Sequence, residues 1–161
     1  MADFKFTSDE FFKKLIEGKI LSKLILFDVI FIDGLHLADQ LEKDIDNALK
    51  FIKEDGFIIV HDVNPPTEWH ARESYSYKHT PAEGYWSGTS WKSFLNKRFD
   101  KRLKSCCINA DWGIGIISKK HNIGNSIQRT NHFFEYKDFE KNRKKYLNLI
   151  SFDEFFSLIE S

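Results

Sequence analysis

The chain has 161 residues, of which 42% are hydrophobic, and its 24 Lys and Arg balance its 24 Asp and Glu. This balance excludes the general attraction that draws strongly basic chains to nucleic acid or to anionic membranes, and no apolar stretch has the length of a membrane span. We therefore expect one compact cytoplasmic domain that binds neither nucleic acid nor membranes.

The first predicted elements are a short helix and an apolar strand. Thr7 and Glu10 have the spacing of a capping box, and apolar residues follow at helical spacing, which predicts a helix that ends near Glu17. Residues 24–32 are apolar apart from Asp28 and rich in β-branched side chains. Such a strand is typical of the centre of a parallel sheet, where helices cover both of its faces.

A crossover helix and a second strand come next. Apolar residues recur every three or four positions over residues 37–52 while charged residues take the opposite face, which predicts an amphipathic helix. Gly56, preceded by two acidic residues, is expected to end it before a short strand at residues 57–60. A strand, a helix and a strand in this order predict parallel pairing through a right-handed crossover.

A long loop should follow, because residues 63–88 contain all three prolines and show no periodic pattern. Loops of this length are usually functional or disordered. After it, Thr89 and Ser90 can cap a helix. The aromatic side chains of the loop could form a lid over a ligand or pack on the core; they are Trp69, Tyr75, Tyr77, Tyr85 and Trp86.

Residues 105–109 and 113–118 predict two strands joined as an antiparallel hairpin. The two cysteines of the chain, Cys106 and Cys107, are neighbours in the first of these strands. Side chains alternate between the faces of a strand, so the two thiols cannot form an ordinary disulfide and are expected to stay reduced.

The C-terminal part reads as helical. Residues 136–149 form a basic helical stretch, and Ser151 with Glu154 gives a second capping box before a short terminal helix. We expect residues 1–120 to form an α/β domain and residues 121–161 to be a helical extension packed on that same domain.

Polar side chains follow both strands of the predicted parallel pair. The first strand leads into Asp33, Gly34 and His36, and the second into His61, Asp62 and Asn64. Because the carboxyl ends of adjacent parallel strands meet at one edge, Asp33 and Asp62 are expected close enough to share a divalent cation or a substrate. His36, His61 and His70 add imidazoles that could bind a metal or act as general bases near neutral pH.

Each of these residues also has a purely structural interpretation. Asp33 could cap the crossover helix, His36 could bond to backbone in its first turn, and His61 could be a satisfied histidine at a strand end. Asp62 and Asn64 could form a turn before the prolines that follow. The concentration of such residues at two consecutive strand ends favours a functional site.

The strand ends carry a family resemblance. Residues 27–36 and 54–62, followed by Asn64-Pro65-Pro66, resemble the fourth and fifth strands of class I S-adenosylmethionine-dependent methyltransferases. Residues 7–12 are similar to the part after that family's third strand, and residues 86–91 are similar to the start of the helix after its fifth strand. Residues 111–115 are similar to its seventh strand, and residues 139–155 are similar to its usual ending.

This resemblance implies a Rossmann-like α/β sheet, mostly parallel with an antiparallel C-terminal hairpin, that lacks the first two strands of the family. It implies S-adenosylmethionine as the methyl donor and a small hydroxylated acceptor such as a sugar or metabolite. The glycine-rich turn with which the family binds its donor has no counterpart in the chain.

The resemblance also implies roles at the strand ends. Asp33 and Gly34 would contact the donor, and the catalytic candidates are Asp33, His36, His61 and Asp62. Metal-dependent members hold Mg²⁺ at positions that match Asp33, His61 and Asp62, although a histidine biases such a site away from Mg²⁺. The acceptor-binding candidates are Asn64, Trp69, His70 and Trp86.

Without the first two strands, residues 26–32 would form an open sheet edge. We expect it to be covered by a refolded N-terminal segment, by a second copy of the chain or by a separate polypeptide. Two other functions stay open. The chain could be a non-catalytic interaction module that keeps the sheet, or a metal-dependent hydrolase that uses the acid and imidazole groups at the strand ends.

Overall fold

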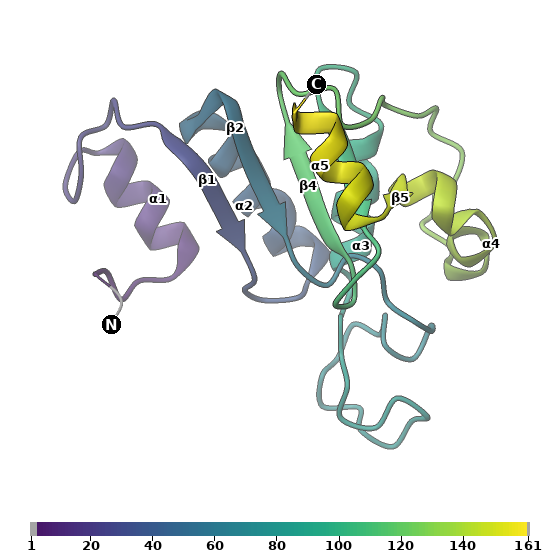
Figure 1. The fold of residues 1–161 in the computed structure, drawn as a ribbon. Coiled ribbons are helices and arrows are strands. Elements are labelled where there is room, and N and C mark those ends of the chain that lie inside the picture. The colour runs from purple at the N-terminus through teal and green to yellow at the C-terminus, as the bar shows by residue number, and fades with distance from the viewer. Residues whose placement is uncertain (1–2, 161) are drawn as a thin grey trace.

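The computed structural model describes residues 3–160 as an α/β fold built on one five-stranded sheet (Figure 1). The strand order is β1-β2-β4-β3-β5, partly parallel and partly antiparallel, which confirms the expected Rossmann-like α/β class. The elements are α1 (Ser8–Ile16), β1 (Phe27–Ile32), α2 (Ala38–Phe51), β2 (Ile52–Val60), α3 (Ser90–Arg98), β3 (Lys104–Ile108), β4 (Ile114–Ser118), α4 (Tyr136–Leu147), β5 (Leu149–Ile150) and α5 (Phe152–Glu160).

The β1-α2-β2 unit has the predicted parallel pairing. Phe31 lies opposite Ile59 and Ile32 opposite Val60, so both strands end at the same edge of the sheet. The second strand is longer than predicted, because residues 54–56 continue it instead of separating it from the helix. A Cβ at Gly56 would lie 2.8 Å from the carbonyl oxygen of Asp28, so glycine allows the two backbones to approach where the pairing is irregular.

The prediction that β1 is a central strand covered on both faces is wrong for the described residues. It is the edge strand, and no strand of residues 3–160 pairs with its free side. Phe31 is 60% exposed and Val29 is 51% exposed, although their apolar character suits a covered face. The expectation of an open edge at residues 26–32, which followed from the resemblance, is confirmed for the described residues.

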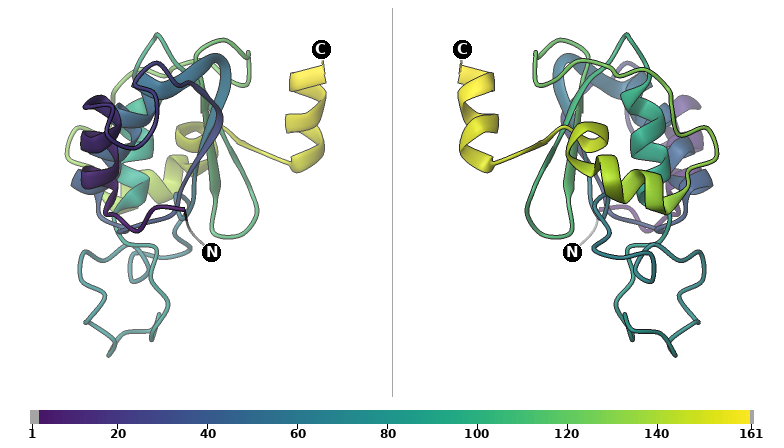
Figure 2. Two further views of the ribbon diagram at one scale, coloured as in Figure 1. Left: turned by 90° about the vertical axis from the view of Figure 1, so that its left-hand side faces the viewer. Right: turned by 90° about the vertical axis from the view of Figure 1, so that its right-hand side faces the viewer.

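The C-terminal half completes the sheet through the predicted antiparallel hairpin. β4 pairs with both β2 and β3, and Cys106 and Cys107 are buried free thiols, as expected. Figure 2 shows α1 to α4 on one side of the sheet and α5 alone on the other, where Phe155 lies edge-on to Phe57 with ring centroids 6.0 Å apart. The two-residue strand β5 was not predicted, because α4 ends two residues earlier than expected, before a left-handed Asn148.

Helix caps were predicted correctly at α1 and α5 and wrongly at α3. Thr7 and Glu10 form a reciprocal capping box, and Ser151 and Glu154 do the same. Thr89 does not cap its own helix. Its backbone is not in the extended conformation that capping needs, and its hydroxyl instead accepts a hydrogen bond from the first residue of α2.

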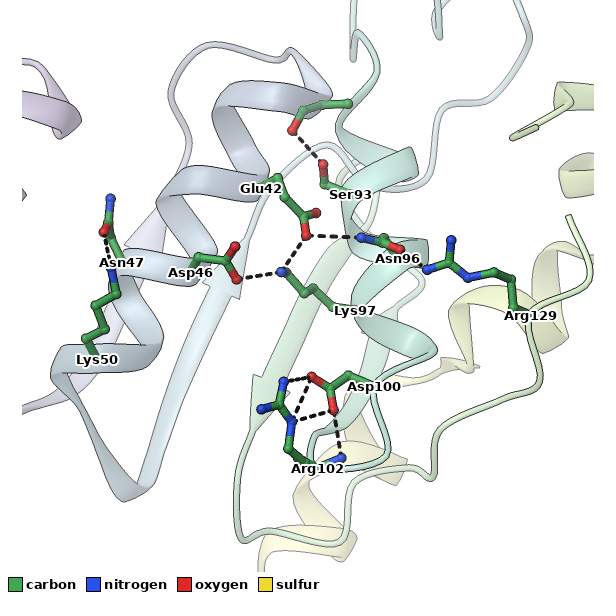
Figure 3. Close-up of polar contacts among 11 residues, drawn as sticks. Glu42, Asp46, Asn47, Lys50, Ser93, Asn96, Lys97, Asp100, Arg102 and Arg129 are labelled. Carbon is green, nitrogen blue, oxygen red and sulfur yellow. Dashed lines mark hydrogen bonds and ion pairs between the residues drawn. The ribbon is translucent and has the colours of Figure 1, made fainter. Parts of the chain in front are cut away.

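A polar layer fixes α2 against α3 (Figure 3). The ammonium of Lys97 lies 2.6 Å from Glu42 and 2.7 Å from Asp46, and Asn96 donates a second hydrogen bond to Glu42. The hydroxyl of Ser93 donates to the carbonyl of Ala38 at 2.6 Å. These contacts hold the first half of α2, which is joined to the end of β1 by residues 33–37. None of the described helices has both the length and the apolar character needed to cross a membrane.

Candidate functional site

Two carboxylates and two imidazoles meet where β1 and β2 end. The Nε2 of His36 lies 3.3 Å from Asp33 Oδ1, and its Nδ1 lies 3.2 Å from Asp62 Oδ2. The Nδ1 of His61 lies 3.5 Å from each of the same two carboxylates. The sequence-predicted catalytic residues therefore form one cluster, which we call the strand-end cluster.

The parallel register explains why these side chains converge. Because Ile32 and Val60 are partners, the residues that follow them, Asp33 and His61, begin at the same height of the sheet. The alternative structural role of Asp33, as the cap of α2, is wrong. The N-cap position of α2 is Leu37, four residues later in the chain. Asp62 has a φ of 59°, a left-handed conformation that costs free energy in a non-glycine residue and is common at functional sites.

Burial makes the electrostatics of the strand-end cluster unusual. Asp62 is only 6% exposed, and this burial raises the pKa of its carboxyl despite the opposing charges of His36 and His61. Burial alone would lower the pKa of His61, but the neighbouring carboxylates of Asp62, Asp111 and Asp33 outweigh it, so this pKa is raised. The electrostatics of the cluster therefore favour a positive charge at its centre, either a proton on imidazole or a cation.

Three members of the cluster have the geometry of metal ligands. One ligand atom from each of Asp33, His61 and Asp62 lies within 4.8 Å of the others. Two carboxylate oxygens and one imidazole nitrogen at this separation fit a divalent ion, and they are the residues that the resemblance implied for metal binding.

Sequence reasoning missed Asp111, which lies in the turn between β3 and β4. Its Oδ2 is 3.1 Å from the Nε2 of His61, on the side of the ring that faces away from the other carboxylates. From the sequence, Asp111 belongs to a hairpin turn and to a segment similar to the family's seventh strand, and neither gives it a role in the site. Its nearness to the cluster depends on β4 pairing beside β2, a tertiary arrangement that the local sequence does not encode.

The predicted acceptor residue Trp86 contacts the strand-end cluster. Its ring stacks on His36 with centroids 5.3 Å apart, and its Nε1 donates to the carbonyl of Arg72 at 2.7 Å. Arg72 itself donates to the carbonyls of Trp69 and Tyr85, which gives this part of the loop a defined shape. The structure thus places one loop aromatic as a wall of the cluster.

The other acceptor candidates lie further out. His70 bonds to Thr67 and packs edge-on against Trp112. The side chain of Asn64 bonds to Asn109 and Arg143, so its amide is engaged within the protein. Trp69 is 48% exposed at the loop surface.

A cavity of about 690 Å³ opens beside the strand-end cluster, between the N-terminal segment, α1 and the end of β1. Five of its fifteen lining residues are phenylalanines, and Asp33 and Gly34 also line it. A second cavity of about 800 Å³ lies between the beginnings of α2 and α3, and no member of the cluster lines it. The lining of the first includes Phe4, Phe6, Phe11, Phe31, Asp33 and Gly34.

The segment that contains the strand-end cluster matches a known protein family. Residues 5–63 match the family model described as a methyltransferase domain. This segment is part of a class I methyltransferase-like domain. The matched residues run from the start of α1 to just past β2 and include all four members of the strand-end cluster, whereas Asp111 and Trp86 lie outside them. No curated protein matches the chain.

Proposed function

We propose that this methyltransferase-like chain transfers a methyl group from S-adenosylmethionine to a small hydroxylated acceptor, such as a sugar or metabolite. One observation carries the proposal: Asp33 belongs both to the aromatic cavity and to the strand-end cluster. The cavity has the volume of a small-ligand site, and aromatic walls suit a flat ring such as adenine. An acceptor hydroxyl at the imidazoles would then lie next to a donor in the cavity.

The residues of the cluster can move the proton that this reaction releases. Bound S-adenosylmethionine supplies an electrophilic methyl group, and the acceptor oxygen must lose its proton as it takes that group. A neutral ring nitrogen of His61 or His36 can accept the proton as a general base. The carboxylates of Asp62 and Asp33 then stabilise the imidazolium that forms, since each lies within 3.5 Å of an imidazole nitrogen.

A divalent metal is an optional part of this proposal. Asp33, His61 and Asp62 would hold it, with the ligand separations described above. When bound, it would stabilise negative charge on the acceptor oxygen. His36 would then remain free of the metal and could keep the role of base.

Donor binding is the direct test. Calorimetry of the purified chain should detect S-adenosylmethionine binding, and Asp33→Asn should weaken it by about tenfold, a typical cost of one charge-assisted hydrogen bond. Asp39→Asn, in the first turn of α2, is the matched control and should leave binding unchanged. Absence of binding by the unaltered chain, or equal binding by both variants, would contradict the proposal.

The acceptor class is tested by turnover. Release of S-adenosylhomocysteine should rise when hydroxylated sugars and small alcohols are screened, and it should fall in His61→Ala and His36→Ala. A general base contributes about 10²- to 10⁴-fold to a rate. A rate unaffected by either substitution would remove the imidazoles from the mechanism.

A further inference from the structure

We propose that Asp111 is the outer carboxylate that holds His61 in place as a metal ligand, and that the ion is a transition metal such as Mn²⁺ or Zn²⁺ in preference to Mg²⁺. The inference relies on the proposed function only for the location of the site. It adds a residue from outside the matched segment and specifies the metal.

The ring of His61 lies between carboxylates on two sides. Its Nδ1 faces Asp33 and Asp62, while its Nε2 lies 3.1 Å from Asp111. Histidines that bind metals almost always donate their other ring N–H to a carboxylate or carbonyl. In this arrangement Nε2–H donates to Asp111, and the lone pair of Nδ1 points to the space that the two inner carboxylates share.

The carboxylate of Asp62 is buried. Its side chain is 9% exposed, and among residues 3–160 its ion-pair partners are the rings of His36 and His61. A carboxylate removed from water is stabilised by a positive charge close to it. An ion held by Asp33, His61 and Asp62 would supply that charge, because an imidazole that binds a metal is itself neutral.

The ligand set indicates the type of metal. One imidazole nitrogen, from His61, joins carboxylate oxygens from Asp33 and Asp62. Mg²⁺ prefers oxygen ligands in a near-ideal octahedron and keeps several waters. Imidazole nitrogen suits Zn²⁺, whereas Mn²⁺ accepts the carboxylates and begins the first-row series whose affinities rise towards Cu²⁺.

The turn that carries Asp111 is fixed to the site. Asp111, Trp112 and Gly113 have φ values of 43°, 62° and 94°. The turn is hydrogen-bonded to the residues after Asp62. The backbone amide of Asn64 donates to the carbonyl of Trp112 at 2.8 Å, and the backbone amide of Val63 donates to the carbonyl of Gly113. The carboxylate of Asp111 is nevertheless 72% exposed, so its removal should cost the fold little.

The test is metal titration of the full chain after chelation and gel filtration. Calorimetry with MnCl₂, ZnCl₂ and MgCl₂ in separate runs should show one equivalent of Mn²⁺ or Zn²⁺ bound, with Mg²⁺ at least tenfold weaker. Asp111→Asn should weaken Mn²⁺ binding by about 10- to 100-fold. Glu54→Gln removes a carboxylate of similar exposure, 79%, at the other end of β2 and should have no effect.

Two further measurements make the outcome decisive. Co²⁺ absorption in the visible range should change its intensity and position in His61→Ala, which reports loss of a nitrogen ligand. Far-ultraviolet circular dichroism of Asp111→Asn should match that of the unaltered chain. No stoichiometric metal binding, equal affinity in Asp111→Asn, or Mg²⁺ binding as tight as Mn²⁺ would overturn the proposal. These titrations contain no methyl donor, so their failure is distinguishable from a failure of methyl transfer.

Discussion

The hydroxyl of Thr89 accepts a hydrogen bond from the amide of Ala38 at 2.8 Å, so the residue before α3 caps the start of α2. The backbone amide of Thr89 in turn donates to the carbonyl of His36 at 2.8 Å. This pair of bonds joins the end of the long loop to the segment that carries an imidazole of the strand-end cluster.

Thr89→Val should destabilise the protein by about 1–2 kcal/mol, because it removes the acceptor and leaves the amide of Ala38 without its cap. Thr89→Ser keeps the hydroxyl and should cost clearly less. Urea unfolding followed by circular dichroism measures both. If the two variants unfold at the same urea concentration, the cap contributes nothing measurable.

Lys97→Met should cost about 1–2 kcal/mol. The ammonium is nearly buried and bonds to Glu42 and Asp46, but the latter is 55% exposed, which screens part of the interaction. Lys92→Met, whose partner Glu73 is 78% exposed, is the control and should cost less than about 0.5 kcal/mol.

The same contact gives a pH dependence. Burial alone would lower the pKa of Lys97, but its bonds to Asp46 and Glu42 raise it above the ordinary value of 10.5. Its contribution is therefore complete below the unfolded pKa and is lost as the pH rises through the higher folded pKa. The stability difference between the unaltered chain and Lys97→Met should be equal at pH 7 and 9 and should shrink only above pH 10.5. A difference that already declines by pH 9 would contradict this.

Gly113→Ala should destabilise the hairpin turn by about 1–3 kcal/mol. The backbone has a φ of 94°, and an added Cβ would lie 2.4 Å from the Cβ of Asn64. Gly84→Ala meets no atom within 4 Å and has no positive φ, so it is the matched control and should change stability little. Thermal unfolding of the two variants measures the difference. If both substitutions shift the unfolding temperature equally, the turn adapts to the added Cβ without cost.

We propose that the open edge of β1 pairs with a second copy of the chain, so Phe31→Lys should reduce self-association. The residue is 60% exposed on an edge strand, where apolar side chains and unpaired backbone groups promote contact with other strands and a lysine discourages it. Phe133→Lys replaces an aromatic ring that is 87% exposed and lies outside the sheet. Light scattering over a range of concentrations should show a smaller average mass for Phe31→Lys than for Phe133→Lys. An equal decrease in both variants would show that the loss of an exposed aromatic ring, and not its position on the edge strand, causes the effect.

Local patterns predicted the parts of the fold that depend on local physics. The capping box at Thr7 and the period of α2 act within a few residues, so they could be read directly. The convergence of Asp33 and Asp62 followed from parallel pairing, which a strand-helix-strand order strongly favours. The composition of β1 wrongly indicated a central strand, whereas the resemblance to a sheet that lacks its first two strands correctly predicted an open edge. Sequence reasoning failed for Asp111, because its position depends on which strands lie side by side.

The left-handed backbone conformation of Asp62 implies a trade-off between the stability of the fold and the function of the site. Glycine adopts this conformation without strain, so Asp62→Gly should relieve about 1 kcal/mol of backbone strain. The substitution also removes a buried carboxylate and with it the cost of keeping that group out of water. A library screened only for thermal tolerance should therefore enrich glycine or asparagine at this position. The survivors of such a screen would be the variants that had lost the group on which both imidazoles converge.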